Sequence, residues 1–447
     1  MSPVALRLSV MMFLQFFIWG AWYVTAPLYL SNIGFDGVDI GWTYSVGPIA
    51  ALISPLFVGM VADRFFPSER VLGVLHILGG LFMASSTLLM NPESPASPDV
   101  INLIFLAHTL CYFPTLALTN SLAMHHITDS KKEFPMIRVF GTLGWIFVGL
   151  LLYWIGWQDR VEMFLLSGAA AILLGLYSFT LPHTPPPARG KKVSVAQLLG
   201  ADALTLLKNR SFSVFLAGSF LLCIPLAFYY QLAARSVQQT GIENVSGTMI
   251  LGQASEVGFM LLMPFFFVRL GVKKMLAVGM IAWIARYALF AVGAPAAISW
   301  MMIGGILLHG ICYDFFFVTG QIYTDQVAPK EIRSQAQGLL AMLTLGLGML
   351  IGAQAAGQIE MRYTPAASVT ASAEAQDLAG QISRLQSAAP ADAAQQIEAL
   401  ESQRSAKALE ALQLIDWRSI WLIPAAVAGG IWALFMLFFK EEEPTSA

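Results

Sequence analysis

The sequence predicts an all-α polytopic membrane protein with about twelve transmembrane helices in two six-helix halves. Of its 447 residues, 57% are apolar and only 12% are charged, about half of the roughly 25% charge typical of soluble domains. Apolar runs of about 20 residues, the length that crosses a bilayer as a helix, recur along the chain. A single long polar loop divides these runs evenly, which predicts the two halves.

The apolar runs give the expected helices in order. The first lacks a small-residue cleavage site after it, so we interpret it as an uncleaved helix and not as a signal peptide. The tenth is expected to be tilted or broken. The expected spans are 6–30, 41–62, 71–90, 100–124, 136–156, 162–181, 212–235, 247–268, 273–293, 298–326, 335–358 and 418–439.

The distribution of basic residues predicts the orientation, because cytoplasmic loops carry an excess of Lys and Arg. With an even number of spans both termini lie on one side. If that side is the cytoplasm, most of the 25 basic residues fall in inner segments, whereas the short outer loops carry little more than Arg160. The sequence therefore predicts a multi-pass protein of a bacterial-type inner (plasma) membrane with both termini cytoplasmic.

The domain organisation follows from the loop at 182–211, which opens with four prolines and continues with basic residues. We predict an N-terminal six-helix half at 1–181, a cytoplasmic linker at 182–211 and a C-terminal six-helix half at 212–447. Two halves that rock around a central site are typical of secondary transporters. This organisation favours a transport function.

The segment 364–416 differs from the rest, being rich in Ala, Gln, Ser and Glu. It lies between the last two expected spans, on the outer side. Leu378, Ile382 and Leu385 share one helical face, and Pro390 separates two such stretches. We expect a periplasmic helical insertion. It is either a tolerated insertion that packs on itself, since loops accept insertions at low cost, or a lid or docking element.

The composition also excludes several functions. A net charge of −2 gives no field for nucleic acid. The three cysteines lie far apart in apolar runs and fit small core residues, so neither a disulfide framework nor a metal site is expected. There is no Gly-rich phosphate loop, zinc signature or nucleophile motif. We therefore expect no catalytic residue, no metal and no cofactor.

Four ionisable residues lie inside expected spans: Arg138, Glu256, Arg286 and Asp314. A charge within the bilayer costs several kcal/mol unless it is paired or hydrated, so such residues are functional candidates by default. Two are basic and two are acidic. This balance predicts that they pair in the interior.

Three groups of side chains share helical faces. Arg138, Thr142 and Trp145 follow i, i+4, i+7 spacing, which places a guanidinium, a hydroxyl and an aromatic ring in one line. Such a line suits a polar ligand with a flat ring. Gln253 and Glu256 combine an amide with a carboxylate, which suits ribose hydroxyls or a base edge.

The first expected span repeats the combination of amide and aromatic rings. Gln15, Trp19 and Trp22 share one of its faces.

Asp314 lies in an aromatic run, YDFFF. Apolar surroundings favour the neutral form of a carboxyl group and can bring it into the range where it exchanges protons. Asp314 is our candidate for carrying a coupling proton, and Glu256 is the second candidate. The alternative is a static ion pair that locks the helices together.

The remaining candidates have structural interpretations. For Arg286 we favour a structural role. His108 and His309 lie in spans and could titrate near neutral pH, but lone histidines in apolar runs are more often hydrogen-bonded core residues.

At these residues the sequence resembles the nucleoside–proton symporter family of the major facilitator superfamily, over nearly the whole chain except 364–416. The superfamily motif G-x-x-x-D-R/K occurs as GMVADR at 59–64, with Gly59, Asp63 and Arg64 as the expected cytoplasmic gate loop. The family motifs are LQFFIWGAW (14–22), YFPTL (112–116), FPMIRVFGT (134–142), QASE (253–256), DFF (314–316) and IRSQAQG (332–338).

The resemblance implies the major facilitator fold and nucleoside uptake driven by the proton gradient, without a cofactor. By motif position, Arg138, Thr142, Trp145, Gln253 and Glu256 are implied substrate contacts, and Asp314 is an implied essential carboxylate. The expected partners are a nucleoside, a proton and membrane lipid, with no nucleic acid, and the protein is expected to be a monomer.

Three positions depart from the family pattern. On the seventh span, Ala227 and Tyr230 stand where the family has substrate-facing amides, and on the tenth His309 replaces a family tyrosine. We therefore include Tyr230 and His309 among the expected substrate contacts, with Gln15 and Trp19. The departures leave the choice of purine, pyrimidine or another sugar-bearing solute open.

The predicted function is import of nucleosides by proton symport with alternating access. The alternatives are a major facilitator carrier for another small polar, sugar-like solute, or a membrane sensor that does not transport. A sensor would need a cytoplasmic output domain, and the inner loops are too short to hold one. An intramembrane enzyme would need a nucleophile–base pair, which the sequence lacks.

Overall fold

The computed structural model describes residues 2–127, 130–186, 201–329, 332–388 and 393–440. Within these ranges the ordered elements are helices and the rest is turn or loop, with no β-strand. This is what a membrane imposes, because a helix satisfies every backbone hydrogen bond within its own segment. Nine of the described helices are long and apolar enough to span a bilayer. The total of twelve remains a prediction.

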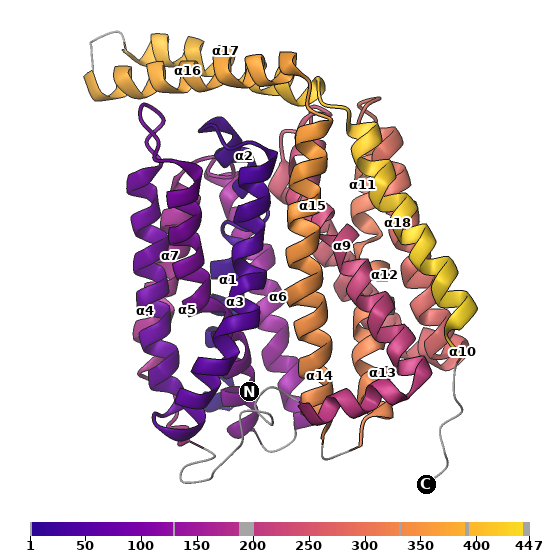
Figure 1. Cartoon of the computed structure of the whole chain (residues 1–447). Helices are drawn as coiled ribbons and strands as arrows, with labels where there is room; N and C mark the ends of the chain where they lie inside the picture. The colour runs from indigo at the N-terminus through magenta and orange to yellow at the C-terminus, as the bar shows by residue number, and fades with distance from the viewer. Residues whose placement is uncertain (1, 128–129, 187–200, 330–331, 389–392, 441–447) are drawn as a thin grey trace. The chain divides into compact units, whose positions relative to one another are not determined.

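The chain forms two compact units (Figure 1). Unit 1 comprises Met1–Lys191, Glu243–Gly247 and Gly357–Ile415, and unit 2 comprises Lys192–Ile242, Thr248–Ala356 and Asp416–Ala447. The predicted insertion at 364–416 lies by contact in unit 1 up to Ile415, and the division into an N-terminal and a C-terminal half stays a prediction. Of the expected linker, residues 187–200 lie outside the described part.

Unit 1 contains the first six expected spans. Its elements are α1 (Pro3–Gly20), α2 (Ala26–Asn32), α3 (Gly37–Arg64), α4 (Ser68–Ser86), the 3-10 turn η1 (Thr87–Leu89), α5 (Pro98–His125), α6 (Ser130–Trp154) and α7 (Glu162–Ser178). α1 packs on α6 and α7, and α4 packs on α5 and α7.

The prediction of one helix over 6–30 is wrong, because the chain turns between Gly20 and Ala26 and a separate helix α2 begins there, with Pro27 near its first position. Proline lacks the N–H that a continuous helix would need, but it fits a helix start.

Unit 2 is built from α9 (Arg210–Gln238), most of α10 (Val245–Gly293) and the segments of the tenth span. The remaining elements are η2 (Ala201–Lys208), α11 (Ser299–Leu307), α12 (His309–Cys312), η3 (Tyr313–Val318), α13 (Thr319–Val327), α14 (Arg333–Ala341), η5 (Met342–Gly348) and α18 (Trp417–Phe438). α15 (Met349–Arg362) begins in unit 2 and ends in unit 1.

Three irregularities shape unit 2. α10 is two helices joined at Gly271, whose φ of 67° is in the region that favours glycine, as the two expected spans 247–268 and 273–293 require. The tenth span is broken as expected, since α11 ends at Leu307 and a π-helical segment, η3, separates α12 from α13. A second π-helical segment, η5, separates α14 from α15.

The insertion forms a helical hairpin of α16 (Ala366–Ala388) and α17 (Ala393–Gln413), which lies across the ends of the unit 1 helices (Figure 1). Small buried residues of α16, Ala371, Ala375 and Ala379, let α17 approach closely. The hairpin also contacts the loops of unit 1: Arg160 forms a 3.6 Å ion pair with Glu401.

Candidate functional site

The predicted polar and aromatic line on α6 forms in unit 1. Arg138, Thr142 and Trp145 are all partly buried. The Cζ atom of Arg138 lies 4.0 Å from the centroid of the Phe16 ring on α1, a distance at which a guanidinium is attracted to the aromatic face. The guanidinium is thus oriented by an aromatic ring of α1.

Glycines determine how closely α6 approaches α1. A Cβ atom on Gly144 would collide with the backbone carbonyl oxygen of Phe13, and one on Gly141 would lie 2.6 Å from the Phe16 ring. Small residues at such crossings are typical of membrane helices. The close crossing brings Trp145 edge-on to Trp19, with ring centroids 5.5 Å apart and an interplanar angle of 76°.

Gln15 lies in the core of unit 1, fully buried. Its Nε2 donates to Thr115 Oγ1 at 2.8 Å, and its Oε1 lies 2.8 Å from His76 Nε2. Both ends of the amide therefore have protein partners. Its predicted contact with the substrate stays a prediction, and the structure adds these two protein partners, which lie 100 and 61 residues away in the sequence.

In unit 2, α10 and α12 bring Glu256 and His309 together. A Cβ on Gly310 would lie 2.5 Å from the backbone oxygen of Ser255, and the Gly310 N–H donates to Ser255 Oγ at 2.9 Å. This close contact places His309 Nε2 3.8 Å from Glu256 Oε2. Gln253 is partly buried one turn earlier on α10.

Aromatic rings surround the His309 imidazole. It stacks on Tyr229 with centroids 5.4 Å apart and on Tyr313 at 5.9 Å. Tyr230 lies next to Tyr229 in a T-shaped contact at 5.6 Å. The predicted residues Tyr230, His309 and Glu256 therefore belong to one polar–aromatic cluster of unit 2.

Asp314 is the second residue of the π-helical segment η3 and is fully buried. Neither of its carboxylate oxygens has a hydrogen-bond partner among the described residues. Glu256 is close enough to interact with it electrostatically. Two acidic groups thus lie near one another in an apolar interior, which disfavours charge on both.

The contacts of Arg286 contradict the prediction that the four intramembrane charges pair with one another. Its Nε donates to the Gly305 backbone oxygen at 3.1 Å, and its Cζ lies 4.2 Å from the Tyr229 ring centroid. Its Nη1 and Nη2 atoms have no partner in the part of the chain that the structure describes, and neither does Asp314. Arg286 and Asp314 therefore form no ion pair.

Other predicted residues lie apart from these clusters. Gly59, Asp63 and Arg64 fall at the end of α3, and their side chains lie outside the described part of the structure. His108 is a core residue whose Nδ1 lies 2.8 Å from the Gly79 backbone oxygen. Among the described residues, no group of His, Cys, Asp and Glu could hold a metal ion.

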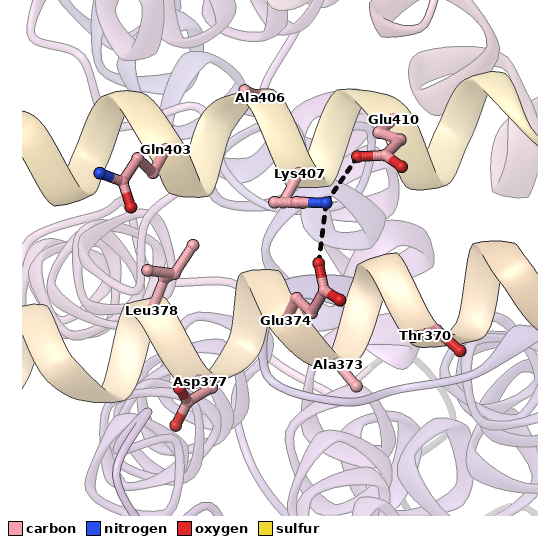
Figure 2. Close-up of a pocket in the computed structure, with 9 residues that line it drawn as sticks. All are labelled: Thr370, Ala373, Glu374, Asp377, Leu378, Gln403, Ala406, Lys407 and Glu410. Carbon is pink, nitrogen blue, oxygen red and sulfur yellow. Dashed lines mark ion pairs between the residues drawn. The ribbon is translucent and has the colours of Figure 1, made fainter.

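A groove between α16 and α17 is lined by none of the predicted site residues (Figure 2). Lys407 Nζ on α17 forms ion pairs with Glu374 Oε2 at 2.8 Å and Glu410 Oε2 at 2.9 Å. These hydrogen bonds raise the pKa of Lys407 above its usual range. The groove is a feature of the hairpin packing.

The structure adds residues that the sequence analysis did not single out. Tyr229 contacts both Arg286 and His309, and His76 contacts Gln15. Tyr229 could have been found from its place beside Tyr230. No signal in the sequence distinguishes His76 from His108, since both are lone histidines in apolar runs.

Comparisons with known proteins show which family and which relatives the sequence is similar to. The family described as nucleoside H⁺ symporter matches residues 1–374. The chain is 42% identical over 361 residues to the putative nucleoside transporter YegT of Escherichia coli, covering 78% of this chain and 83% of that one. It is 32% identical over 377 residues to the xanthosine permease of Escherichia coli, covering 79% and 87%.

The chain is also similar to solved structures. The crystal structure of the nucleoside transporter NupG matches with a TM-score of 0.79 and 26% identity, covering 98% of this chain and 100% of that one. The crystal structure of a D-xylose–proton symporter shares the fold, with a TM-score of 0.65 at 12% identity, covering 90% and 97%.

Proposed function

Because this chain belongs to the nucleoside H⁺ symporter family, we propose that Asp314 carries its coupling proton and that a polar–aromatic cluster in each unit contacts the nucleoside during transport. The chain is a multi-pass membrane transporter with the major facilitator fold, and it imports nucleosides together with protons by alternating access.

The cluster on α6 suits the nucleobase. The Arg138 guanidinium presents donors in a fixed planar fork that matches base carbonyl groups. Thr142 adds a hydroxyl that both donates and accepts, and the Trp145 ring offers a face for stacking. Trp19 supports that ring at 5.5 Å.

The cluster of unit 2 suits the ribose. The Glu256 carboxylate accepts hydrogen bonds from sugar hydroxyls, and the amide of Gln253 both donates and accepts. His309 lies 3.8 Å from Glu256 and can orient it. Tyr230 completes the cluster with a hydroxyl and a ring.

The observation that carries the proposal for the proton is the environment of Asp314. A buried carboxylate without a donor or counter-ion is costly, by several kcal/mol, whereas its protonated form is neutral. Both oxygens of Asp314 lack a partner among the described residues. We infer that Asp314 is protonated in this conformation, and that loss of the proton favours a rearrangement.

The direction of transport follows from the proton gradient. Because protons are more abundant outside, Asp314 takes up its proton from the outside and releases it to the inside. The negative charge left after release is unfavourable in this surrounding and also near Glu256, and this instability favours a return to the outward-facing state.

The topology completes the proposal. Both termini lie in the cytoplasm, because this orientation places most Lys and Arg residues in inner segments. The protein acts as a monomer in a bacterial-type inner membrane, without a cofactor. Labelling of single cysteines at either terminus with an impermeant thiol reagent in intact cells tests the orientation. Labelling without cell lysis would contradict it.

The most direct test of the function is uptake of labelled uridine and adenosine into proteoliposomes, with and without an inward proton gradient. We expect accumulation above equilibrium with the gradient and equilibration without it. Equal final levels in both conditions would contradict proton coupling.

A second measurement separates the nucleoside function from that of a sugar carrier. A ligand that binds only the folded state raises the melting temperature. We expect stabilisation by nucleosides and none by free sugars. The opposite ranking would assign the chain to another small polar solute.

A further inference from the structure

Three buried polar side chains join α1, α4 and α5 of unit 1. They are Gln15, His76 and Thr115, and each is 1% exposed or less. Gln15 Nε2 donates to Thr115 Oγ1 at 2.8 Å, and Gln15 Oε1 lies 2.8 Å from His76 Nε2. Buried polar groups are normally hydrogen-bonded, and this chain of bonds satisfies both ends of the amide.

The hydrogen bonds among these three side chains allow one consistent assignment of donors and acceptors. The Thr115 hydroxyl donates to the Tyr112 backbone oxygen at 2.5 Å, so it accepts from the amide of Gln15. The amide oxygen of Gln15 then faces His76, which must carry its proton on Nε2. His76 therefore acts as a neutral donor in this chain of bonds.

Tyr112 forms a second hydrogen bond to the same part of α1. Its hydroxyl donates to the Gln15 backbone oxygen at 2.6 Å. Its ring makes T-shaped contacts with His76, at 5.9 Å between centroids, and with Trp19, at 6.1 Å. His76, Tyr112 and Trp19 thus form a continuous edge-to-face series from α4 to α1.

The hydrogen bonds of Gln15 affect the proposed nucleobase contacts because they set the orientation of α1. Residues four apart on a helix lie on the same face, so the bonds to Gln15 fix the rotation of α1 at which Trp19 meets Trp145. The Trp19–Trp145 contact places the ring that stacks on the base. Gly20 on α1 also touches this ring, since a Cβ there would lie 3.2 Å from it.

From this geometry we propose that His76 is a positioning residue for nucleoside recognition, acting through Gln15 and Trp19 on Trp145. The inference rests on the proposed function, in which Trp145 stacks on the nucleobase. His76 itself touches no substrate. Its donor proton holds the amide that sets the position of α1.

The test compares two buried histidines that both contact the Tyr112 ring but differ in their hydrogen-bond partner. His76→Phe keeps the ring and removes the donor to Gln15. His108→Phe is the matched control, because His108 also stacks on Tyr112, at 5.8 Å, but donates to Gly79 on α4 and does not touch Gln15. Both variants lose one buried histidine hydrogen bond, so both are expected to lower the melting temperature.

Kinetics distinguish positioning from stability. For uridine uptake into proteoliposomes, we expect His76→Phe to raise KM about 5- to 10-fold, a change of the size expected for one lost hydrogen bond, with the accumulation ratio at saturation retained. His108→Phe should leave KM within about twofold. His76→Gln can donate to the Gln15 oxygen and should recover most of the affinity.

Three results would overturn the inference: an unchanged KM in His76→Phe, equal KM effects in both histidine variants, or no recovery in His76→Gln. If His76→Phe does not fold, Thr115→Val removes the acceptor at the other end of the amide and should raise KM in the same direction. An unchanged KM there also overturns it. Failure of the proposed function differs, since wild-type protein would then not take up uridine.

Discussion

The Gln15 network of unit 1 and the buried charges Asp314 and Arg286 of unit 2 differ in how well their polar atoms are satisfied. In unit 1, Gln15, His76 and Thr115 bond one another within 2.8 Å. In unit 2, Asp314 and the Nη atoms of Arg286 are fully buried and have no partner among the described residues. Satisfied networks rigidify a fold, whereas an unpaired buried charge marks a functional group or a strained state. We therefore propose that the Gln15 network holds part of unit 1 in place and that unit 2 carries the proton chemistry.

The two units also differ in the regularity of their helical backbones. Within the described residues, both π-helical segments, η3 and η5, belong to unit 2. Such segments are uncommon and frequently occur at functional sites. Asp314 lies inside η3, so its carboxyl group is attached to an irregular stretch of backbone that can change its hydrogen bonding. No comparable segment adjoins Gln15.

The largest effect on transport is expected from a substitution of Asp314, the unpaired carboxyl group of unit 2. Asp314→Asn keeps the size of the side chain and removes its titration, so gradient-driven accumulation of uridine should be abolished. Exchange of uridine across the membrane without a gradient should persist. Asp325→Asn is the control, because Asp325 is also acidic and close in sequence but is exposed and paired with Arg333 at 3.3 Å. Accumulation at the wild-type level in Asp314→Asn would remove the residue from the mechanism.

The next effect tests the packing that joins Glu256 to His309. Gly310→Ala introduces a Cβ 2.5 Å from the Ser255 backbone oxygen, which forces α10 and α12 apart. Overpacking of this kind costs about 1–3 kcal/mol, so we expect a melting temperature lower by several degrees and a marked loss of uptake.

Gly258→Ala, also on α10, is the control for Gly310→Ala, because a Cβ there meets nothing within 4 Å. It should be close to neutral in stability and uptake. Equal effects of the two substitutions would show that the crossing of α10 and α12 does not position the cluster.

A smaller effect is expected on α6 of unit 1. Arg138→Lys keeps the charge but loses the planar fork and the contact with Phe16. We expect KM for uridine to rise about tenfold, equivalent to about 1.4 kcal/mol, with the accumulation ratio preserved. Loss of accumulation at saturating uridine would place part of the coupling in unit 1 and break the comparison.

The smallest effect is expected at the hairpin. The pKa of Lys407 is raised by hydrogen bonds to Glu374 and Glu410. A raised folded-state pKa adds stability below the unfolded pKa, and this stability is lost only as pH rises through the folded value, far above neutrality.

Lys407→Met should therefore lower the melting temperature slightly and equally at all pH values from 6 to 8, about the physiological range, with uptake unchanged. Exposed ion pairs contribute little to stability. A change in uptake would give the hairpin a part in transport.

The sequence was sufficient for most spans, since apolar runs of the required length leave few alternatives. The expected span 212–235 corresponds to α9, Arg210–Gln238. The sequence also isolated Asp314 and Glu256, because charges are rare inside such runs. The turn between α1 and α2 was missed, because its residues are as apolar as their neighbours.

The partners of buried residues were not predictable in the same way. A π-helical segment of six residues leaves no periodic signal in a run of aromatic residues such as YDFFF. Gln15 and His76 are 61 residues apart, and only the folding of unit 1 brings them together. The failed pairing of Arg286 with Asp314 has the same origin, since charge balance in the sequence does not determine distance.

The most direct test of the central claim is infrared difference spectroscopy of the purified protein as pH is raised, following the carbonyl stretch of protonated carboxyl groups. If Asp314 carries the coupling proton, wild-type protein shows a protonated-carboxyl band that disappears in Asp314→Asn and remains in Glu256→Gln. A band that persists in Asp314→Asn would show that another group holds the proton.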